Sequence, residues 1–499
     1  MTDNNVCFII KDLQGRFINM RMTFVVPPEP GKEVAAERSA GCTRIVYPMP
    51  NIYELIAAAC LEDKGHKVKL VDFVAEKGDA DAVERFLRTD NSSAYLVWSV
   101  NLSRNADFAF RDMALRLRPE AKVIFMGPGA TFFPELYLTD NRVTIVRGEP
   151  EATLLELAEY LEKDKDFSNL QGLILLDSDG AIKRNPARPL IQDIDTLPFP
   201  ARHLLKGRSY HNPKLKLSPY TTMVTSRNCP YQCIYCVPSS LTFARELDYR
   251  ADHGRKPPIT MRSPENVAKE IDMLSAEGYK AIGFVDDNFI WDLERTSALC
   301  EPLRRHGIKW GCQARVDAIT EPIAKLLGES GCTYIDLGIE SFEDEILKFI
   351  KKGITSEQIY RAIDLLQKYK VPVKLNILIG TSPLETKETL RRTLRKAMKL
   401  NVDQVMFNIV SPFPGTEFYK MAHENGWIKG GEYSPTNVQK ESILSYPHLS
   451  AEDMEKALYR FNLRYFLSPR VVLKHLRRFK NASEFMYALK ALRTKLFWQ

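Results

Sequence analysis

Short runs of apolar, β-branched residues alternate with longer stretches of helical periodicity over the first third of the chain. The pattern predicts strands at 22–26, 67–72, 94–100 and 122–126, with helices at 51–64 and 108–117 and further alternation up to Val146. Strands that alternate with helices in this way pair in parallel and form a doubly wound sheet. Ligands of such sheets bind at the carboxyl ends of the strands, so the loops after Val26, Val100 and Met126 form the candidate pocket.

The pattern changes near residue 170 and then resumes in the second half of the chain. Residues 170–176 and 180–184 have the alternation of a small hairpin, and the proline-rich stretch 190–200 indicates a stiff linker. Six strand-then-helix units follow, with predicted strands at 221–226, 281–286, 309–315, 333–340, 373–380 and 404–411. Ser263 before Pro264, Ser356 and Thr386 are suited to open the helices between them. Six such units predict a partial (β/α)6 barrel that is open on one side.

The predicted fold class is therefore α/β with two parallel-sheet regions. We expect a Rossmann-like domain over 1–168, a hairpin and linker over 169–215, a partial barrel over 216–430 and a helical C-terminal region over 431–499. A chain of 499 residues with 44% hydrophobic content is long enough for two or three packed domains. No run approaches the roughly 20 apolar residues of a membrane-spanning helix.

Positive charge is concentrated at the C-terminal end. The net charge of the chain is +7, yet residues 456–499 hold eleven Lys and Arg against Glu484 alone, so this segment carries +10 and the remainder −3. Basic and apolar residues interleave there at helical spacing: Val472, Leu476 and Phe479 with Arg470, Lys474, Arg477 and Arg478, then Phe485, Leu489, Leu492 and Leu496 with Lys490, Arg493 and Lys495. This pattern fits amphipathic helices that bind an anionic membrane or pack over the open side of the barrel. It also fits a docking helix whose basic face is solvated. Nucleic-acid binding is disfavoured, because no RNA module or stacking motif accompanies the charge.

Three cysteines stand in one short loop, Cys229-Pro-Tyr-Gln-Cys233-Ile-Tyr-Cys236, after the first strand of the second half. Iron–sulfur clusters are usually held by four cysteines, and structural zinc by four protein ligands. A triad therefore predicts a [4Fe–4S] cluster with one iron open to bind and transform a ligand. A zinc knuckle needs a fourth ligand, and the nearest histidine, His253, lies well beyond the loop. Disulfides are disfavoured, since a chain of this size does not need them and a reducing cytoplasm is the simpler context.

The spacing of these cysteines resembles that of the radical S-adenosylmethionine (SAM) enzymes, in which the methionyl amine and carboxylate of the cofactor bind the fourth iron. The resemblance implies that Cys229, Cys233 and Cys236 hold a [4Fe–4S] cluster and form the catalytic centre. Reductive cleavage of SAM then yields a 5′-deoxyadenosyl radical that abstracts hydrogen from an unactivated carbon. The resemblance also implies an electron donor of the flavodoxin or ferredoxin type.

Further candidate residues stand at the predicted strand ends, where barrel chemistry is located. By the resemblance, Tyr235 packs against adenine, and Asp286 or Asp287 accepts hydrogen bonds from the methionyl ammonium. Arg315 is suited to the methionyl carboxylate, because a guanidinium matches it with two donors. A core position for Tyr235 and a capping role for the two aspartates remain alternatives.

The later strand ends complete this set. Glu340 is suited to the ribose hydroxyls, and Ser341 to a neighbouring polar contact. Gly380 permits close approach of the backbone to adenine, and Val410 and Ser411 end the last strand. A coincidence of residue type and position at six strand ends favours the radical SAM reading.

The first 168 residues resemble the cobalamin-binding domain that precedes the radical domain in a large subfamily. The resemblance is carried by Gly65-His66-Lys-Val, Met126-Gly-Pro-Gly-Ala-Thr131 and Arg147-Gly-Glu-Pro-Glu151, and it implies cofactor contacts at Ser99, Asn101, Gly127, Gly129 and Glu149. The motif D-x-H-x-x-G is missing from the sequence, and His66 stands at the start of a strand, so a histidine ligand to cobalt is not expected. A Rossmann-like domain without cofactor is the alternative.

Taken with the resemblance, these features predict a radical SAM enzyme. The main expectation is cobalamin-dependent methylation of a hydrophobic small molecule, lipid-like or tetrapyrrole-like. Radical cyclisation, oxidation or carbon–carbon coupling without methyl transfer is the alternative, and a non-catalytic iron–sulfur electron carrier a distant one. An RNA-modifying relative is disfavoured by the lack of a second cysteine triad. We expect a cytoplasmic protein, and contact of the basic segment with the inner face of the membrane is one of the alternatives for this segment.

Overall fold

The computed structural model describes residues 20–31, 34–44, 47–210, 212, 214–215 and 217–476. The chain divides into two compact units. The first comprises Met1–Pro230, Val237–Gln313 and Glu329–Thr333, and the second comprises Tyr231–Cys236, Ala314–Gly328 and Tyr334–Gln499. The boundaries that the sequence pattern predicts for its domains remain a prediction.

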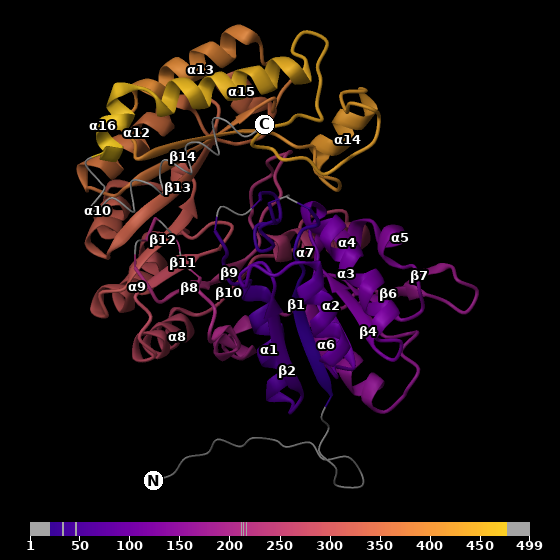
Figure 1. Ribbon diagram of the computed structural model, residues 1–499. Coiled ribbons are helices and arrows are strands. Elements are labelled where there is room, and N and C mark those ends of the chain that lie inside the picture. The colour runs from indigo at the N-terminus through magenta and orange to yellow at the C-terminus, as the bar shows by residue number, and fades with distance from the viewer. Residues whose placement is uncertain are drawn as a thin grey trace, which may run out of the picture. The chain divides into compact units, whose positions relative to one another are not determined.

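A seven-stranded sheet forms the centre of the first unit (Figure 1). Its strands are β1 (Arg21–Val26), β2 (Lys67–Asp72), β3 (Ala94–Trp98), β4 (Lys122–Met126), β5 (Val143–Val146), β6 (Leu173–Leu176) and β7 (Ile182–Arg184), in the order β2-β1-β3-β4-β5-β6-β7. The strands β1 to β5 pair in parallel, and β6 and β7 continue the sheet in antiparallel orientation. The expected doubly wound sheet is confirmed, and the expected hairpin extends its β5 edge.

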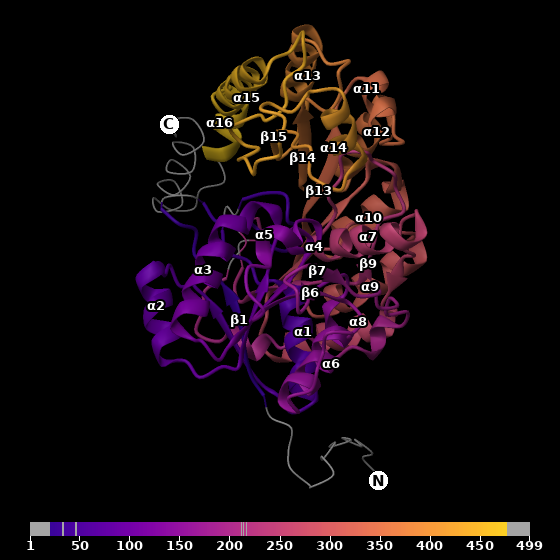
Figure 2. The same ribbon diagram turned by 90° about the vertical axis from the view of Figure 1, so that its right-hand side faces the viewer.

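Helices cover both faces of this sheet. They are α1 (Ile52–Asp63), α2 (Ala80–Thr89), α3 (Arg104–Leu117), α4 (Pro128–Phe132), α5 (Pro134–Tyr137) and α6 (Pro150–Glu162). On one face, α2 and α3 pack on the strands through a core that includes Leu87, Tyr95, Phe110 and Phe125. In Figure 2, α1 and α6 lie on the other side of the sheet, where they pack against each other. Every residue of α1 from Ile52 to Leu61 is buried, which explains why this helix is apolar on all sides apart from Glu54.

The first unit also contains the first three strands of the second half of the chain. These are β8 (Tyr220–Met223), β11 (Ala281–Phe284) and β12 (Lys309–Ala314), parallel and in the order β12-β11-β8, with the short antiparallel pair β9 (Ser226–Arg227) and β10 (Thr260–Met261). The helices are α7 (Ser240–His253), α8 (Pro264–Ala276) and α9 (Leu293–Arg305). The single strand predicted at 221–226 is wrong, because Thr225 donates its N–H and hydroxyl to Asp286 and so breaks the strand into β8 and β9. Ser263 caps α8 as expected.

The second unit continues the alternation of strands and helices. Its strands β13 (Cys332–Glu340), β14 (Val373–Ile379) and β15 (Gln404–Ile409) are parallel, in the order β15-β14-β13. Its helices are α10 (Glu321–Glu329), α11 (Asp344–Phe349), α12 (Ser356–Lys368), α13 (Lys387–Lys399), α14 (Glu417–Glu424), α15 (Ala451–Phe466) and α16 (Pro469–Leu476). In Figure 1, α12, α13 and α15 cover these strands. Thr386 caps α13 as expected, whereas Thr355, not Ser356, caps α12.

The expected helical C-terminal region is confirmed as far as Leu476 by α15 and α16. The apolar and basic positions from Arg477 onward, which carry much of the predicted amphipathic pattern, lie outside the described residues, as do the side chains of Lys474 and Leu476. In the part of the chain that the structure describes, no helix is both long enough and apolar enough to cross a membrane.

Candidate functional site

The cysteine loop follows β9, and the side chains of Cys229, Cys233 and Cys236 are all partly buried. The backbone of Ile234 is held from two sides, because its N–H donates to the Ile350 carbonyl at 3.2 Å and its own carbonyl accepts from the Phe418 N–H at 2.9 Å. The Cys236 N–H donates to the Cys233 carbonyl at 3.3 Å, which makes a turn between these cysteines. Three thiols in one anchored loop are a suitable donor set for an iron–sulfur cluster. Among the described residues, no three His, Cys, Asp or Glu side chains are already grouped as a metal site, so the ligand roles remain a prediction.

A buried ion pair lies beside this loop in the second unit. Lys352 Nζ is 2.8 Å from Glu340 Oε1 and 3.4 Å from the Tyr235 hydroxyl oxygen, and the two charged side chains are 9% and 7% exposed. Burial, and then the charge of Glu340, raise the pKa of Tyr235 well above its ordinary value, so its hydroxyl stays protonated. Tyr235 and Glu340, which the sequence placed in the cofactor site, are thus brought together. Lys352 was missed, because nothing in Lys351-Lys352-Gly353 distinguishes a buried lysine from an exposed one.

The backbone at Glu340 has an unusual conformation. Its φ is +59°, and the pairing of β13 with β14 is irregular between Gly338 and Glu340. A side chain at position 338 would place its Cβ 2.6 Å from Glu340 Oε1 and 3.0 Å from Lys352 Nζ, so Gly338 leaves the room that the ion pair occupies. A non-glycine residue with positive φ costs on the order of 1–3 kcal/mol, and such strain is typical of functional sites.

Arg315, at the end of β12, is fixed from three directions. Its Nε and Nη2 each lie 2.9 Å from the carboxylate of Asp317, and Nη2 also donates to the Lys352 carbonyl at 2.7 Å. Its guanidinium carbon lies 3.5 Å from the centroid of the Tyr231 ring. Burial opposes ionisation of Arg315, but Asp317 outweighs it, and the pKa of the guanidinium is raised. A methionyl carboxylate that bound Arg315, as predicted, would have to share its guanidinium with the carboxylate of Asp317.

Gly380, which follows β14, adopts a φ of +82° in a tightly bonded loop. The buried carboxylate of Glu385 accepts from the N–H of Gly380 at 2.8 Å, the N–H of Thr381 at 3.0 Å and the Thr381 hydroxyl at 2.7 Å. The Tyr446 hydroxyl donates to the Gly380 carbonyl at 2.7 Å. Burial raises the pKa of Glu385 to about 7. The sequence identified Gly380 but missed Glu385, the residue that shapes its loop.

The remaining candidates of the second unit are buried at strand ends. Ser341 accepts at Oγ from the Glu343 N–H at 3.2 Å, and the Val410 N–H donates to the Ile379 carbonyl at 2.9 Å. Ser411 Oγ and Asn408 Oδ1 are buried, and neither has a hydrogen-bond partner within the described residues. Unsatisfied buried oxygens are costly, so these two atoms fit a site that a polar ligand completes.

Asp286 and Asp287, in the first unit, both bond to neighbouring backbone and hydroxyl groups. Asp286 Oδ1 lies 3.0 Å from the Thr225 nitrogen, 2.6 Å from the Thr225 hydroxyl and 2.7 Å from the Ser226 hydroxyl. Burial raises the pKa of Asp286 to about 6. Asp287 accepts from the Ser239 N–H and the Thr242 hydroxyl at the start of α7. These bonds match the capping alternative, and contact with the methionyl ammonium remains a prediction.

A buried charge network precedes the first cysteine. Arg227 donates to Glu149 at 2.7 Å and to Glu151 at 2.6 Å, and Arg245 lies 3.1 Å from Glu149. The other oxygen of Glu149 accepts from the Ile191 N–H at 2.7 Å. The sequence assigned Glu149 to cofactor binding, but here its carboxylate already joins three elements of the fold.

Four predicted cofactor contacts lie at the carboxyl edge of the seven-stranded sheet. The buried Ser99 hydroxyl lies 2.6 Å from Asp107 Oδ2 and 2.6 Å from the Tyr137 hydroxyl. A Cβ on Gly127, whose φ is +89°, would lie 2.5 Å from the Ser99 carbonyl, and one on Gly129 would lie 2.9 Å from the Tyr137 hydroxyl. Close packing therefore explains both glycines. Asn101 differs, because its buried Oδ1 has no partner among the described residues.

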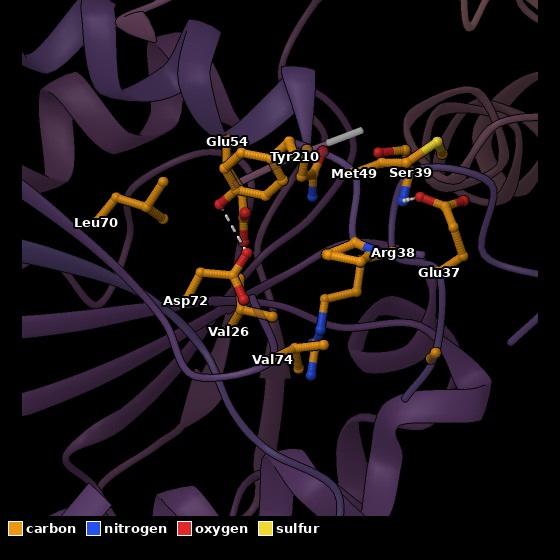
Figure 3. Close-up of a pocket in the computed structure, with 13 residues that line it drawn as sticks. Val26, Glu37, Arg38, Ser39, Met49, Glu54, Leu70, Asp72, Val74 and Tyr210 are labelled. Atoms are coloured by element: carbon orange, nitrogen blue, oxygen red, sulfur yellow. Dashed lines mark hydrogen bonds between the residues drawn. The ribbon is translucent and has the colours of Figure 1, made fainter. Parts of the chain in front are cut away.

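A pocket opens at the ends of β1 and β2 (Figure 3), where the loop after Val26 was expected to bind a ligand. The empty space in it and in the open solvent at its mouth is about 450 Å³ together. The pocket is lined by Val26, Ala36, Glu37, Arg38, Ser39, Pro48, Met49, Asn51, Glu54, Leu70, Asp72, Val74 and Tyr210. Asp72 accepts from the Tyr210 hydroxyl at 2.8 Å, as the dashed line in Figure 3 shows. Burial raises the pKa of Glu54 to about 8. His66 lies at the opposite end of β2, where its Nδ1 accepts from the Met20 N–H at 3.4 Å.

Comparison with known proteins identifies one part of the chain directly. Residues 223–397 match the model of the radical SAM superfamily. An uncharacterized methyltransferase of Pyrococcus horikoshii is 29% identical over 466 residues, which cover 91% of this chain and 94% of the relative. The cytidylyl-2-hydroxyethylphosphonate methyltransferase of Streptomyces wedmorensis is 25% identical, with 84% and 86% covered. The anaerobic magnesium-protoporphyrin IX monomethyl ester cyclase of Rubrivivax gelatinosus is 26% identical, with 62% and 54% covered.

Solved structures share the fold over nearly the whole chain. OxsB, a cobalamin-dependent SAM radical enzyme whose structure holds aqua-cobalamin and SAM, aligns with a TM-score of 0.70 at 16% identity, over 96% of this chain and 72% of OxsB. TsrM, a radical SAM methyltransferase from Kitasatospora setae with cobalamin and a [4Fe–4S] cluster bound, aligns with a TM-score of 0.63 at 16% identity, over 91% and 90%. Both alignments therefore extend over the seven-stranded sheet and over the strand–helix units of this chain.

Proposed function

We propose that this protein, an enzyme with a radical SAM domain, is a cobalamin-dependent radical SAM methyltransferase. The observation that carries the proposal is the loop Cys229–Cys236 inside a radical SAM domain that follows a doubly wound sheet. The methyltransferase relatives align over most of this chain, which supports methyl transfer.

The side chains at the strand ends are suited to hold the two parts of SAM. Cys229, Cys233 and Cys236 would hold the [4Fe–4S] cluster that a radical SAM domain implies. The cluster and SAM, when bound, supply a 5′-deoxyadenosyl radical that takes a hydrogen atom from the substrate. Arg315 would orient the methionyl carboxylate, and Glu340 the ribose hydroxyls. The unsatisfied Ser411 Oγ is available for a further polar contact.

The seven-stranded sheet is the proposed cobalamin domain. Its carboxyl edge carries Asn101, whose Oδ1 lacks a partner in the described part of the chain, and the pocket beside Glu54. Cobalamin, when bound, supplies the methyl group that replaces the abstracted hydrogen. One SAM would then be consumed for the radical and another for the methyl group.

The substrate is proposed to be a hydrophobic small molecule, with an electron donor of the flavodoxin or ferredoxin type. Likeness to a protoporphyrin ester cyclase supports a hydrophobic substrate and favours cyclisation as the second candidate reaction. The phosphonate methyltransferase is named for a polar substrate, so the two relatives point in different directions.

A peripheral membrane contact, in a cytoplasmic protein, is proposed for the C-terminal helices. Leu467, Val472 and Leu473 are 52%, 37% and 54% exposed, next to the exposed Arg470. Glutamine at Arg470, Lys474, Arg477 and Arg478 should reduce binding to anionic liposomes. Unchanged partitioning would contradict the contact.

Anaerobic reconstitution tests the central proposal. Purified protein should bind iron and sulfide and release 5′-deoxyadenosine from SAM when reduced. Cys233→Ala should abolish this product with the fold retained, whereas Cys300→Ala, at a buried cysteine outside the loop, should keep it. A corrin band in protein from cobalamin-supplied cells would support methylation, and its absence would favour cyclisation. A redox-active cluster without SAM cleavage would instead indicate an electron carrier.

A further inference from the structure

Lys352 is a buried cation beside the cysteine loop for which the radical reaction, as described above, has no use. Its ammonium is 2.8 Å from Glu340 Oε1 and 3.4 Å from the Tyr235 hydroxyl oxygen. Its side chain is 9% exposed, so solvent screens its charge only weakly. Tyr235 lies two residues after Cys233 and directly before Cys236, so the charge of Lys352 adjoins the cysteine loop.

A second cation is connected to the first through the backbone. Arg315 donates to the carbonyl of Lys352 at 2.7 Å and rests on the ring of Tyr231, at the other end of the same loop. Lys352 and Arg315 are each paired with a carboxylate. Their carboxylate partners are Glu340 and Asp317. The loop therefore faces two fixed ion pairs.

The local backbone is adapted to the pair of Lys352 and Glu340. Glu340 has a φ of +59°, and a Cβ on Gly338 would approach both charged groups within about 3 Å. A buried ion pair is weak evidence for stability, since an apolar pair of similar volume is often as stable. Stability therefore does not explain the backbone strain and the desolvation of the pair of Lys352 and Glu340, which indicate a functional role of this pair.

We propose that Lys352 is a positioning residue of the cofactor site, which holds Glu340 in place and puts a positive charge beside the cluster loop. The inference rests on the proposed function, because it needs a cluster on this loop. Reduction adds one negative charge to the cluster, and a nearby buried cation stabilises that charge. The potentials of iron–sulfur clusters depend on such charges and on hydrogen bonds near the sulfurs. Lys352 thus makes the cluster easier to reduce.

Replacement of the two members of the ion pair should shift the midpoint potential of the cluster in opposite directions. Lys352→Met removes the positive charge, so the midpoint potential of the cluster should fall. Glu340→Gln keeps the shape but leaves the cation unbalanced, so the potential should rise. A tenfold change in the reduction equilibrium corresponds to about 59 mV for a one-electron couple, and we expect shifts of that order. Lys352→Arg keeps the charge and should stay close to the wild-type potential.

Lys374→Met is a matched control in the same unit. Lys374 on β14 lies 2.9 Å from Asp336 on β13, in a partly buried pair. Its loss should leave the potential unchanged. The measurement is a redox titration of reconstituted protein without SAM, followed by electron paramagnetic resonance of the reduced cluster. Unfolding of the cluster-free variants in urea shows whether each remains folded.

The outcomes separate this inference from the proposed function. Opposite shifts for Lys352→Met and Glu340→Gln support it. Shifts in the same direction, or none, in folded variants that hold the cluster would overturn it and leave Lys352 a purely structural residue. Failure of the wild-type protein to assemble any cluster would instead overturn the proposed function.

Discussion

The guanidinium of Arg315 lies over the ring of Tyr231, with its central carbon 3.5 Å from the ring centroid. The same group forms two bonds of 2.9 Å to the carboxylate of Asp317. The contact with the ring and the bidentate pair with Asp317 fix both its position and its orientation. A lysine ammonium is compact and reproduces neither contact.

Arg315→Lys should therefore weaken the use of SAM although the charge is kept. Loss of the ring contact and of the two hydrogen bonds to Asp317 should cost about 1–2 kcal/mol of binding free energy. This corresponds to roughly a tenfold lower rate of 5′-deoxyadenosine formation at low SAM. Product formation is measured by chromatography after anaerobic reduction. Arg392→Lys is the control, because Arg392 forms a similar pair with Glu343 but is 42% exposed. Equal rates in wild type and Arg315→Lys would show that the guanidinium geometry does not matter.

Gly380→Ala should destabilise the protein more than an ordinary glycine replacement. The new Cβ would lie 2.5 Å from Met454 Sδ, and the residue would have to keep a φ of +82°. Gly426 has a similar φ of +66° with open space around it, so Gly426→Ala reports the backbone strain alone. We expect about 1 kcal/mol for Gly426→Ala and about 2–4 kcal/mol for Gly380→Ala. Urea unfolding of the cluster-free protein measures both, and equal losses would contradict the predicted clash.

Glu149→Gln should lower stability even when no cofactor is present. The carboxylate pairs with Arg227 and Arg245 in the interior, and removal of one partner from a buried ion pair typically costs about 3–5 kcal/mol. Glu159→Gln, on the helix α6 that Glu149 precedes, is the control, because Glu159 is exposed and 3.8 Å from Lys163. Thermal unfolding of cofactor-free protein is the measurement. A variant of normal stability with weaker cobalamin binding would restore Glu149 as a cofactor contact.

The sequence predicted most of the fold because apolar alternation records which side chains are buried. Parallel strands and helix caps such as Ser263 follow from local pattern alone. The predicted strand at 221–226 was wrong because a distant carboxylate, Asp286, takes the N–H of Thr225. Such competition between residues 61 positions apart leaves no local signal.

The site was predictable in its residue types but not in its partners. Lys351 and Lys352 are neighbours in the chain, yet Lys351 is exposed and pairs with Glu417, whereas Lys352 is buried against Glu340. The partner of Lys352, Glu340, lies at the irregularity of β13, which no local pattern indicates. In the same way Gly380 stood out as a glycine, whereas Glu385, which bonds its loop, resembles any surface glutamate.

Glu54 provides a test of the pocket at the sheet edge. This residue of α1 is 2% exposed, and burial raises its pKa to about 8 against the opposing charge of Arg38. Asp72 and Asp107 add to the increase. The folded protein therefore holds a proton on Glu54 at pH values where the unfolded chain, with an ordinary pKa of 4.5, has lost it.

Because the folded state binds more protons between pH 4.5 and about 8, the free energy of unfolding should fall as the pH rises through that window. Glu54→Gln mimics the protonated group and should flatten this slope. It should match wild type near pH 5 and exceed it by a few kcal/mol, at most about 5, above pH 8. Urea unfolding of cofactor-free protein at both pH values measures this difference between variant and wild type. Burial also raises the pKa of Glu29 and of Glu385 to about 7, but their contributions are the same in both proteins and cancel. Glu84→Gln, at an exposed pair with Arg88, should change neither value. A constant difference between Glu54→Gln and wild type at both pH values would show that Glu54 does not titrate in this range.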